Sequence, residues 1–174
     1  AVGIFGKGVG GPAKAAVLSS ALFGTISGSS LANVTTTGTF TIPLMKKTGY
    51  EPEFAGAVEA TASTGGQIMP PVMGAAAFII AEFVGESYLT ICIAAALPAL
   101  LYFIGVFTAV HVKAKASGLK GIPAEELPNV GEVLKKKGYL LLPLVSIVVV
   151  LIIGMSPSMA AFIACLMTIA LSWV

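Results

Sequence analysis

The sequence predicts an all-α membrane protein, a polytopic bundle of helices. Of the 174 residues, 56% are hydrophobic and only 10% are charged, whereas about a quarter of the residues in a soluble domain are charged. The mean hydropathy is +0.96. Four stretches, 15–45, 60–81, 87–112 and 138–174, contain no Lys or Glu, and each exceeds the roughly 20 residues that one membrane crossing needs. This composition argues against a soluble enzyme and against a nucleic-acid-binding protein.

The two ends of the sequence and its two cysteines allow two further expectations. The chain begins Ala-Val-Gly-Ile and ends at Trp173-Val174 within an apolar run, so we expect it to be a piece of a longer polypeptide. Residues 1–12 are interpreted as a lead-in on the cytoplasmic side. Cys92 and Cys165 both lie in apolar segments, where a thiol behaves as a small hydrophobic group and a disulfide framework is not expected.

The first charge-free stretch predicts a re-entrant helical hairpin over residues 13–46. As one straight helix the stretch would reach about 46 Å, too long for one crossing, whereas two full crossings need about 40 residues. Thirteen of the eighteen residues over 24–41 are Gly, Ser, Thr or Asn, so we place the hairpin tip near 24–33. Such polar backbone at membrane depth must be buried in protein or line a water-filled cavity. The alternative is a polar loop over 24–39, outside the membrane, that joins two short helices.

The next two segments are interpreted as membrane helices of different kinds. Residues 55–84 predict a helix that is broken at 65–71, because Pro70 and Pro71 lack backbone donors and two glycines precede them. Residues 88–110 predict a plain transmembrane helix in which only Pro98 introduces a kink.

The lysines predict the orientation of these segments. Residues 111–138 hold six of the ten lysines and predict a cytoplasmic loop. The span over 88–110 then ends inside and the broken helix starts inside. Both ends of the hairpin also fall on the cytoplasmic side, as a re-entrant hairpin requires. The last stretch predicts two short antiparallel spans, 139–153 and 157–174, because turn residues separate them.

The hairpin tip is the candidate site because opposite helix ends meet there. Carbonyl groups at the end of the first half-helix attract a cation, and amides at the start of the second attract an anion. Ion-coupled transporters use broken helices in this way. The oxygen ligands that suit Na⁺ come from Ser27, Ser29, Ser30 and Asn33. Asn33 has the alternative roles of capping the second half-helix or joining two helices.

Two further titratable residues are weaker candidates. A carboxylate within a membrane segment is a functional candidate by default, but Glu59 lies only one to two turns into its segment, so we favour an interfacial, solvated Glu. His111, beside Lys113, is interpreted as a solvated interface residue. The sequence offers no nucleophile with a base, no metal-ligand cluster and no phosphate-binding loop. We therefore expect no enzyme and no cofactor, and no metal other than Na⁺ as a coupling ion.

Five motifs make the sequence recognisable: GGPAKAAV at 10–17, FGTISGSSLANV at 23–34, GTFTIPLMKKTGY at 38–50, FAGAVEA at 54–60 and GGQIMPP at 65–71. They resemble the large membrane subunit of tripartite ATP-independent periplasmic (TRAP) transporters, and in particular the fused permeases that work with TAXI-type binding proteins. Beyond these motifs the resemblance is one of hydropathy.

The resemblance implies an elevator-type secondary transporter that imports an organic anion, a carboxylate, together with Na⁺. It implies two inverted repeats, of which this chain holds part of the first and, at 157–174, the start of the next. In that family the first Na⁺ site lies between the hairpin tip and the break. This adds three backbone carbonyls to the tip ligands: Gly66, Met69 and Pro70. The candidates for the substrate cavity are Thr25, Thr36 and Gln67.

Gln67 departs from the family pattern, since many relatives have Pro at this position. Its side chain either faces the substrate cavity or forms a local hydrogen bond. Val72 stands where a Ser is frequent. Because of these two departures, the resemblance does not determine which side chains of the break face the site.

The resemblance also implies partners and a location. The partners are a periplasmic substrate-binding protein, a small membrane subunit fused upstream, the organic anion and the lipid bilayer, with no nucleic acid. The location is the cytoplasmic (inner) membrane of a bacterium or archaeon, crossed several times. The alternative function is a non-transporting scaffold or anchor subunit whose polar segment only packs helices.

Overall fold

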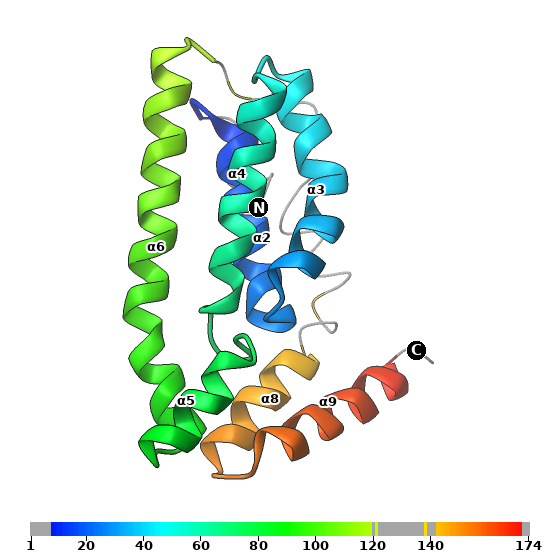
Figure 1. Cartoon of the computed structure of the whole chain (residues 1–174). Coiled ribbons are helices and arrows are strands. Elements are labelled where there is room, and N and C mark those ends of the chain that lie inside the picture. Colours follow the sequence, from blue (N-terminus) through cyan, green and yellow to red (C-terminus); the bar gives the residue numbers. More distant parts are fainter. Residues whose placement is uncertain (1–7, 120, 122–137, 139–141, 172–174) are drawn as a thin grey trace.

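The computed structural model describes residues 8–119, 121, 138 and 142–171 (Figure 1). Every regular element in this part is helical, which confirms the all-α class for the described residues. The elements in chain order are α2 (Gly11–Ser27), α3 (Ser30–Lys47), α4 (Pro52–Thr64), the 3₁₀ turn η1 (Gly65–Gln67), α5 (Ala76–Val84), α6 (Tyr88–Ala116), α8 (Leu142–Ile152) and α9 (Pro157–Leu171).

Helices α2 and α3 form a hairpin whose connection is only Gly28 and Ser29. Gly28 has φ +60°, the left-handed conformation that often ends a helix. Ser29 then caps α3, because its Oγ accepts a hydrogen bond from the backbone N–H of Ala32 at 3.3 Å. Residues 24–27 and 30–39 are helical, so the loop conformation expected for 24–39 in the alternative interpretation is wrong.

The helix after the hairpin is interrupted. Helix α4 ends at Thr64, η1 follows, and residues 68–75 are not helical before α5 begins. The interruption starts where the glycines and prolines predicted it, at 65, and extends four residues beyond 71. Tyr88, the first residue of α6, lies beside this segment. Its hydroxyl is 3.0 Å from the Pro71 carbonyl and also contacts that of Val72, so it can donate to either.

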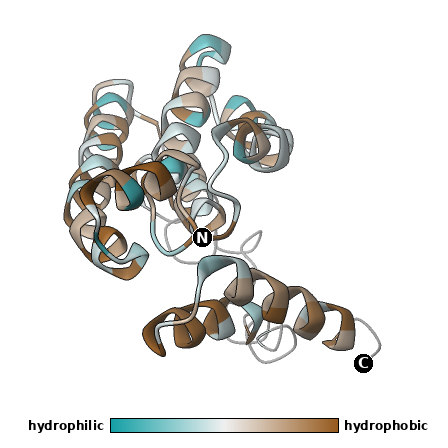
Figure 2. Cartoon of the chain, turned by 60° about the horizontal axis from the view of Figure 1, so that its bottom comes forward, coloured by the Kyte–Doolittle hydropathy of each residue, from teal (hydrophilic) through white to brown (hydrophobic). Residues whose placement is uncertain are grey.

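Helix α6 is the only helix in the described part that is long and apolar enough to cross a membrane, with 29 residues and a mean hydropathy of 2.3 in its most apolar window. It contains the expected span 88–110 and continues to Ala116. Helices α8 and α9 are shorter, with 11 and 15 residues. Figure 2 shows how hydrophobic these last two helices are, next to the C-terminus.

Some of the expected segments extend outside the described residues. These parts are 1–7 of the lead-in, 120 and 122–137 of the predicted loop, and 139–141 and 172–174 of the last two spans.

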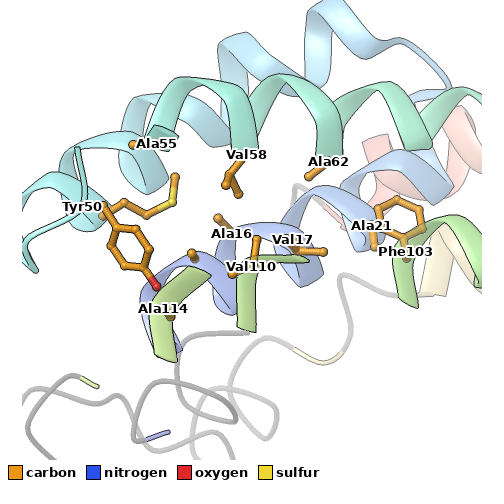
Figure 3. Packing of buried hydrophobic residues seen from close by; sticks show 12 residues of the cluster. Ala16, Val17, Ala21, Tyr50, Ala55, Val58, Ala62, Phe103, Val110 and Ala114 are labelled. Atoms are coloured by element: carbon orange, nitrogen blue, oxygen red, sulfur yellow. The ribbon is translucent and has the colours of Figure 1, made fainter. Parts of the chain in front are cut away.

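Two apolar clusters hold the hairpin and the broken helix together. The first joins α2, α4 and α6 through small side chains, among them Ala16, Ala62 and Ala114, each of which is fully buried (Figure 3). Small residues allow close helix contacts, as in membrane proteins. The second cluster joins Met73 and α5 to the start of α6, to α8 and to α9. The first cluster thus packs α2 against α4, and the second packs the segment after the break.

Candidate functional site at the hairpin tip and the helix break

The tip of the α2–α3 hairpin packs directly against the helix break, and glycines make this contact possible. A Cβ atom added to Gly24 would lie 2.5 Å from the Cα of Gly66, and one added to Gly28 would lie 1.9 Å from the carbonyl oxygen of Met73. Real side chains do not fit at these distances, so backbone meets backbone at both points. The sequence predicted the break as the second wall of the tip, and the structure places the two together.

Polar contacts cross the same boundary. The Gln67 amide donates to the Ser30 hydroxyl oxygen at 2.9 Å, and the backbone N–H of Val72 donates to the Thr25 carbonyl at 3.4 Å. This hydrogen bond of Gln67 joins the break to the tip, so it is not the local bond that was one of the two roles expected for this side chain.

The three candidate serines lie where α2 ends and α3 begins. Ser27 is the last residue of α2, and its Oγ lies 3.2 Å from the backbone N and 3.3 Å from the carbonyl oxygen of Ser29. Ser29 caps α3, and Ser30 accepts the bond from Gln67. A hydroxyl oxygen has two lone pairs, so each can accept one further contact. The free carbonyls of α2 and the free amides of α3 converge at this point.

Asn33 is fully buried and joins the two helices of the hairpin. Its amide group donates to the Ser20 carbonyl at 2.9 Å, and its side-chain oxygen accepts a bond from the Thr37 hydroxyl at 3.1 Å. Of the alternatives for Asn33, the structure shows helix joining, because Ser29 is the residue that caps α3.

The remaining candidates divide between the break and the helix surface. Gly66 is buried, and its carbonyl accepts a bond from the backbone N–H of Met69 at 3.4 Å. Met69 and Pro70 are half-buried in the non-helical segment. Thr36 is exposed on α3, about 9 Å along the helix from Ser30 at 1.5 Å per residue. The structure therefore does not bring Thr36 to the tip.

Glu59 corrects the sequence analysis. The expected solvated interfacial Glu is wrong, because Glu59 has no exposed surface. Helices α2 and α3 cover it, and its carboxyl group contacts the hydroxyls of Ser20, Thr37, Thr41 and Ser63. The position of Glu59, one to two turns from the start of its segment, does not reveal that two other helices bury it. A usable signal exists in the spacing of four between Glu59 and Ser63 and between Thr37 and Thr41, which puts each pair on one helix face. His111 is exposed, as expected.

The chemistry available at the tip is that of neutral oxygen atoms. Within the described residues no group of three or more His, Cys, Asp or Glu side chains comes together. Hydroxyl and carbonyl oxygens at two helix ends suit a hard monovalent cation better than a transition metal, which prefers nitrogen or sulfur ligands.

The described residues define a class of fold, an all-helical arrangement in which a helical hairpin packs on an interrupted helix, and one helix, α6, is long and apolar enough to cross a membrane. The whole chain, residues 1–174, matches the family model described as "Tripartite ATP-independent periplasmic transporter, DctM component". The chain belongs to this family, which confirms the resemblance seen in the motifs. It also confirms the expectation that the protein is not an enzyme, because the family consists of transporter components.

Curated relatives agree with this family. The C4-dicarboxylate TRAP transporter large permease protein DctM of Pseudomonas aeruginosa is 33% identical over 120 residues, which are 68% of this chain and 27% of the relative. The protein of the same name from Vibrio cholerae is 31% identical over 137 residues, 78% of this chain and 29% of the relative. The uncharacterized protein y4mL of Sinorhizobium fredii is 35% identical over 92 residues, 53% of this chain and 22% of the relative. The chain thus spans 22% to 29% of the length of these relatives.

Proposed function

We propose that these residues form part of the permease component of a binding-protein-dependent secondary transporter that imports an organic anion with Na⁺ by an elevator mechanism. The observation that carries the proposal is the contact between the hairpin tip and the break, where Gly24 meets Gly66 and Gly28 meets Met73. Membership of the transporter family gives this contact its functional context.

The proposed Na⁺ site lies between the tip and the break. Its ligands are the hydroxyl oxygens of Ser27, Ser29 and Ser30, the Asn33 side-chain oxygen, and the carbonyls of Gly66, Met69 and Pro70. Helix-end carbonyls and hydroxyls replace the hydration shell of a hard cation. Because the Asn33 oxygen already accepts from Thr37, it offers a cation only its second lone pair.

The proposed substrate is a carboxylate, because the start of α3 presents free backbone amides and the positive end of a helix dipole. Two relatives carry C4-dicarboxylate in their names, which favours a small carboxylate for this chain too. Thr25 and Gln67 stand at the tip boundary and are the residues we propose for the cavity wall. Thr36 is distant from the tip, so it would line the cavity only at a point further along α3 toward its C-terminal end.

The proposed setting follows the family. A periplasmic substrate-binding protein delivers the anion, a small membrane subunit is fused upstream, and the permease crosses the cytoplasmic (inner) membrane of a bacterium or archaeon several times. The hairpin enters and leaves the membrane on the cytoplasmic side. TAXI-type binding proteins are the partners that the motifs favour.

Uptake by proteoliposomes tests this function. The full-length permease and its purified binding protein should accumulate labelled carboxylate only with an inward Na⁺ gradient. Ser27→Ala combined with Ser30→Ala should raise the Na⁺ concentration for half-maximal uptake about tenfold, which is 1.4 kcal/mol, because two oxygen ligands are lost. These serines are preferred to Ser29, whose loss also removes a helix cap.

Thr35→Ala is the matched control, because the exposed Thr35 hydroxyl bonds only carbonyls of its own helix. It should leave the Na⁺ dependence unchanged. An unchanged Na⁺ dependence in the Ser27 and Ser30 variant would remove both residues from the ligand set. Absence of uptake under every gradient, by a correctly folded complex with a loaded binding protein, would favour the scaffold function instead.

A further inference from the structure

The first two turns of α6 contact the carbonyls of the helix break. Tyr88 is the first residue of α6, and its hydroxyl lies 3.0 Å from the Pro71 carbonyl oxygen and also contacts that of Val72. Cys92 follows four residues later on the same face of the helix, with its Sγ 3.5 Å from the Pro71 carbonyl oxygen. Both side chains are buried. The carbonyl groups of Pro71 and Val72 therefore have their donors on α6.

The position of the Tyr88 side chain is fixed from two sides. Ser87 caps α6, because its Oγ accepts a hydrogen bond from the backbone N–H of Thr90 at 3.2 Å, so the helix starts at a defined residue. The Tyr88 ring stacks on Phe78 of α5, with 4.6 Å between the ring centroids. The start of α6 lies beside α5 in Figure 1. Both helices thus hold the hydroxyl at the break.

The other carbonyls of the break differ in their partners. Some accept hydrogen bonds from backbone N–H groups of residues 68–77, namely those of Gly65, Gly66, Gln67 and Gly74. The Met73 carbonyl lies against Gly28 of the tip. The carbonyls of Ile68, Met69 and Pro70 accept no hydrogen bond from any residue that the structure describes. Two of these three, those of Met69 and Pro70, are ligands of the proposed Na⁺ site.

The carbonyls on the two sides of the break are coupled through Pro71. A carbonyl oxygen has two lone pairs, and that of Pro71 meets both Tyr88 and Cys92, so it has none left for a cation. The Pro71 ring fixes φ, and peptide groups are planar. A single rotation, ψ of Pro71, therefore relates the direction of its own carbonyl to that of the Pro70 carbonyl. A donor that fixes the first carbonyl also limits where the second can point.

We propose that Tyr88 is a positioning residue for the proposed Na⁺ site. Its hydroxyl holds the carbonyls of Pro71 and Val72 on the α6 side of the break, which leaves those of Met69 and Pro70 for the cation. Cys92 supports the Pro71 carbonyl as a weaker donor.

This role gives α6 an influence on Na⁺ binding. Helix α6 is long enough to cross a membrane, and it contributes none of the proposed ligands. A side chain at its first residue nevertheless sets the direction of carbonyls that are ligands. The inference rests on the proposed function, because it assigns a further residue to the same site.

Tyr88→Phe in the full-length permease tests this role, because it keeps the stacked ring and removes only the hydroxyl. The Na⁺ concentration for half-maximal uptake by proteoliposomes should rise about fivefold, the effect of one lost hydrogen bond. The maximal rate at saturating Na⁺ should stay close to that of the wild type. A merely structural role would instead lower the maximal rate or the amount of folded protein without changing this Na⁺ concentration.

Tyr102→Phe is the matched control. Tyr102 is another Tyr of α6, and its hydroxyl donates to the Thr61 carbonyl at 2.8 Å, within α4 and before the break. Its loss should leave the Na⁺ concentration for half-maximal uptake unchanged. An unchanged or lowered Na⁺ concentration in Tyr88→Phe, or equal increases in the two variants, would overturn the proposal.

Hydrogen–deuterium exchange without Na⁺ or substrate separates this inference from the proposed function. Tyr88→Phe should speed exchange at the amides of Val72 and Gly74, which are hydrogen-bonded to the tip and within the break, whereas Tyr102→Phe should not. Unchanged exchange in Tyr88→Phe would contradict the positioning role alone. Wild-type uptake that is independent of Na⁺ would instead refute the Na⁺ site itself, and the exchange result would still decide whether Tyr88 holds the break.

Discussion

Tyr50 lies in the short connection between α3 and α4, and its hydroxyl is the buried polar group without a hydrogen-bond partner in the described part of the chain. The ring stacks on Phe54 with 5.9 Å between centroids, and the hydroxyl points toward Ala114 (Figure 3). An unpartnered buried hydroxyl costs about 1–3 kcal/mol. Tyr50→Phe should therefore leave the unfolding temperature of the permease at neutral pH unchanged or raise it by a few degrees, as measured in a thermal scan.

The same residue predicts a pH effect. Burial raises the pKa of Tyr50 from its usual 10 to about 12. The unfolded chain then loses this proton before the folded one, so the residue's contribution to stability is full below pH 10 and falls as the pH rises toward 12. The wild type should lose more stability than Tyr50→Phe across this window. Equal losses, or a lower unfolding temperature for Tyr50→Phe at neutral pH, would contradict the buried, unpartnered hydroxyl.

Individual residues also show how far sequence reasoning reaches. The tip was predicted from the many Gly, Ser, Thr and Asn residues of 24–41, and its serines were selected as oxygen ligands that suit Na⁺. A signal of composition such as this one is local. Glu59 was misread because its burial depends on α2 and α3, which are distant in sequence. No local pattern states which helices cover a given face, although the polar residues spaced four apart on α3 and α4 point toward one another in the fold.

At the scale of the elements, the hairpin and the break are held together at Gly24. An Ala at this position gains helix propensity, by at most about 1 kcal/mol, but its Cβ would lie 2.5 Å from the Cα of Gly66. Overpacking of this kind costs about 1–3 kcal/mol or more. Gly24→Ala should therefore lower the unfolding temperature of the permease. Gly56→Ala is the matched control, because Gly56 is also inside a helix but a Cβ there meets nothing within 4 Å. It should be neutral or stabilising, and equal effects of the two changes would contradict the close contact.

The elements themselves were largely predictable because their causes are local. Glycine and proline mark where helical hydrogen bonding stops, and both the two-residue turn at Gly28 and the interruption at 65–75 follow these residues. The length of the helical parts was less predictable. The Thr-rich run of α3 is helical although Thr is a poor residue for a helix interior. The hydroxyls of Thr35, Thr39 and Thr41 bond carbonyls of their own helix, an arrangement that composition alone does not reveal.

For the whole molecule, the length of α6 can be compared with the thickness of a membrane. Its 29 residues extend about 44 Å, more than the roughly 30 Å of a hydrocarbon core. Many of its large apolar side chains, including Ile93, Leu97 and Leu101, are exposed in the described structure, as expected for a surface that faces lipid or a further part of the permease. Both ends of α6 should therefore reach water on opposite sides of the membrane.

Cysteine labelling of the two ends of α6 tests the orientation proposed from the lysines. Ser87 precedes the helix and Ser117 follows it, and both are exposed. In a full-length permease without other reactive cysteines, an impermeant maleimide added to intact cells whose outer envelope admits it should label Ser87→Cys. It should label Ser117→Cys only after the cytoplasmic membrane is opened, because Lys113 and Lys115 keep that end inside. The reverse pattern would invert the orientation, and labelling of both positions in intact cells would show that α6 does not cross the membrane.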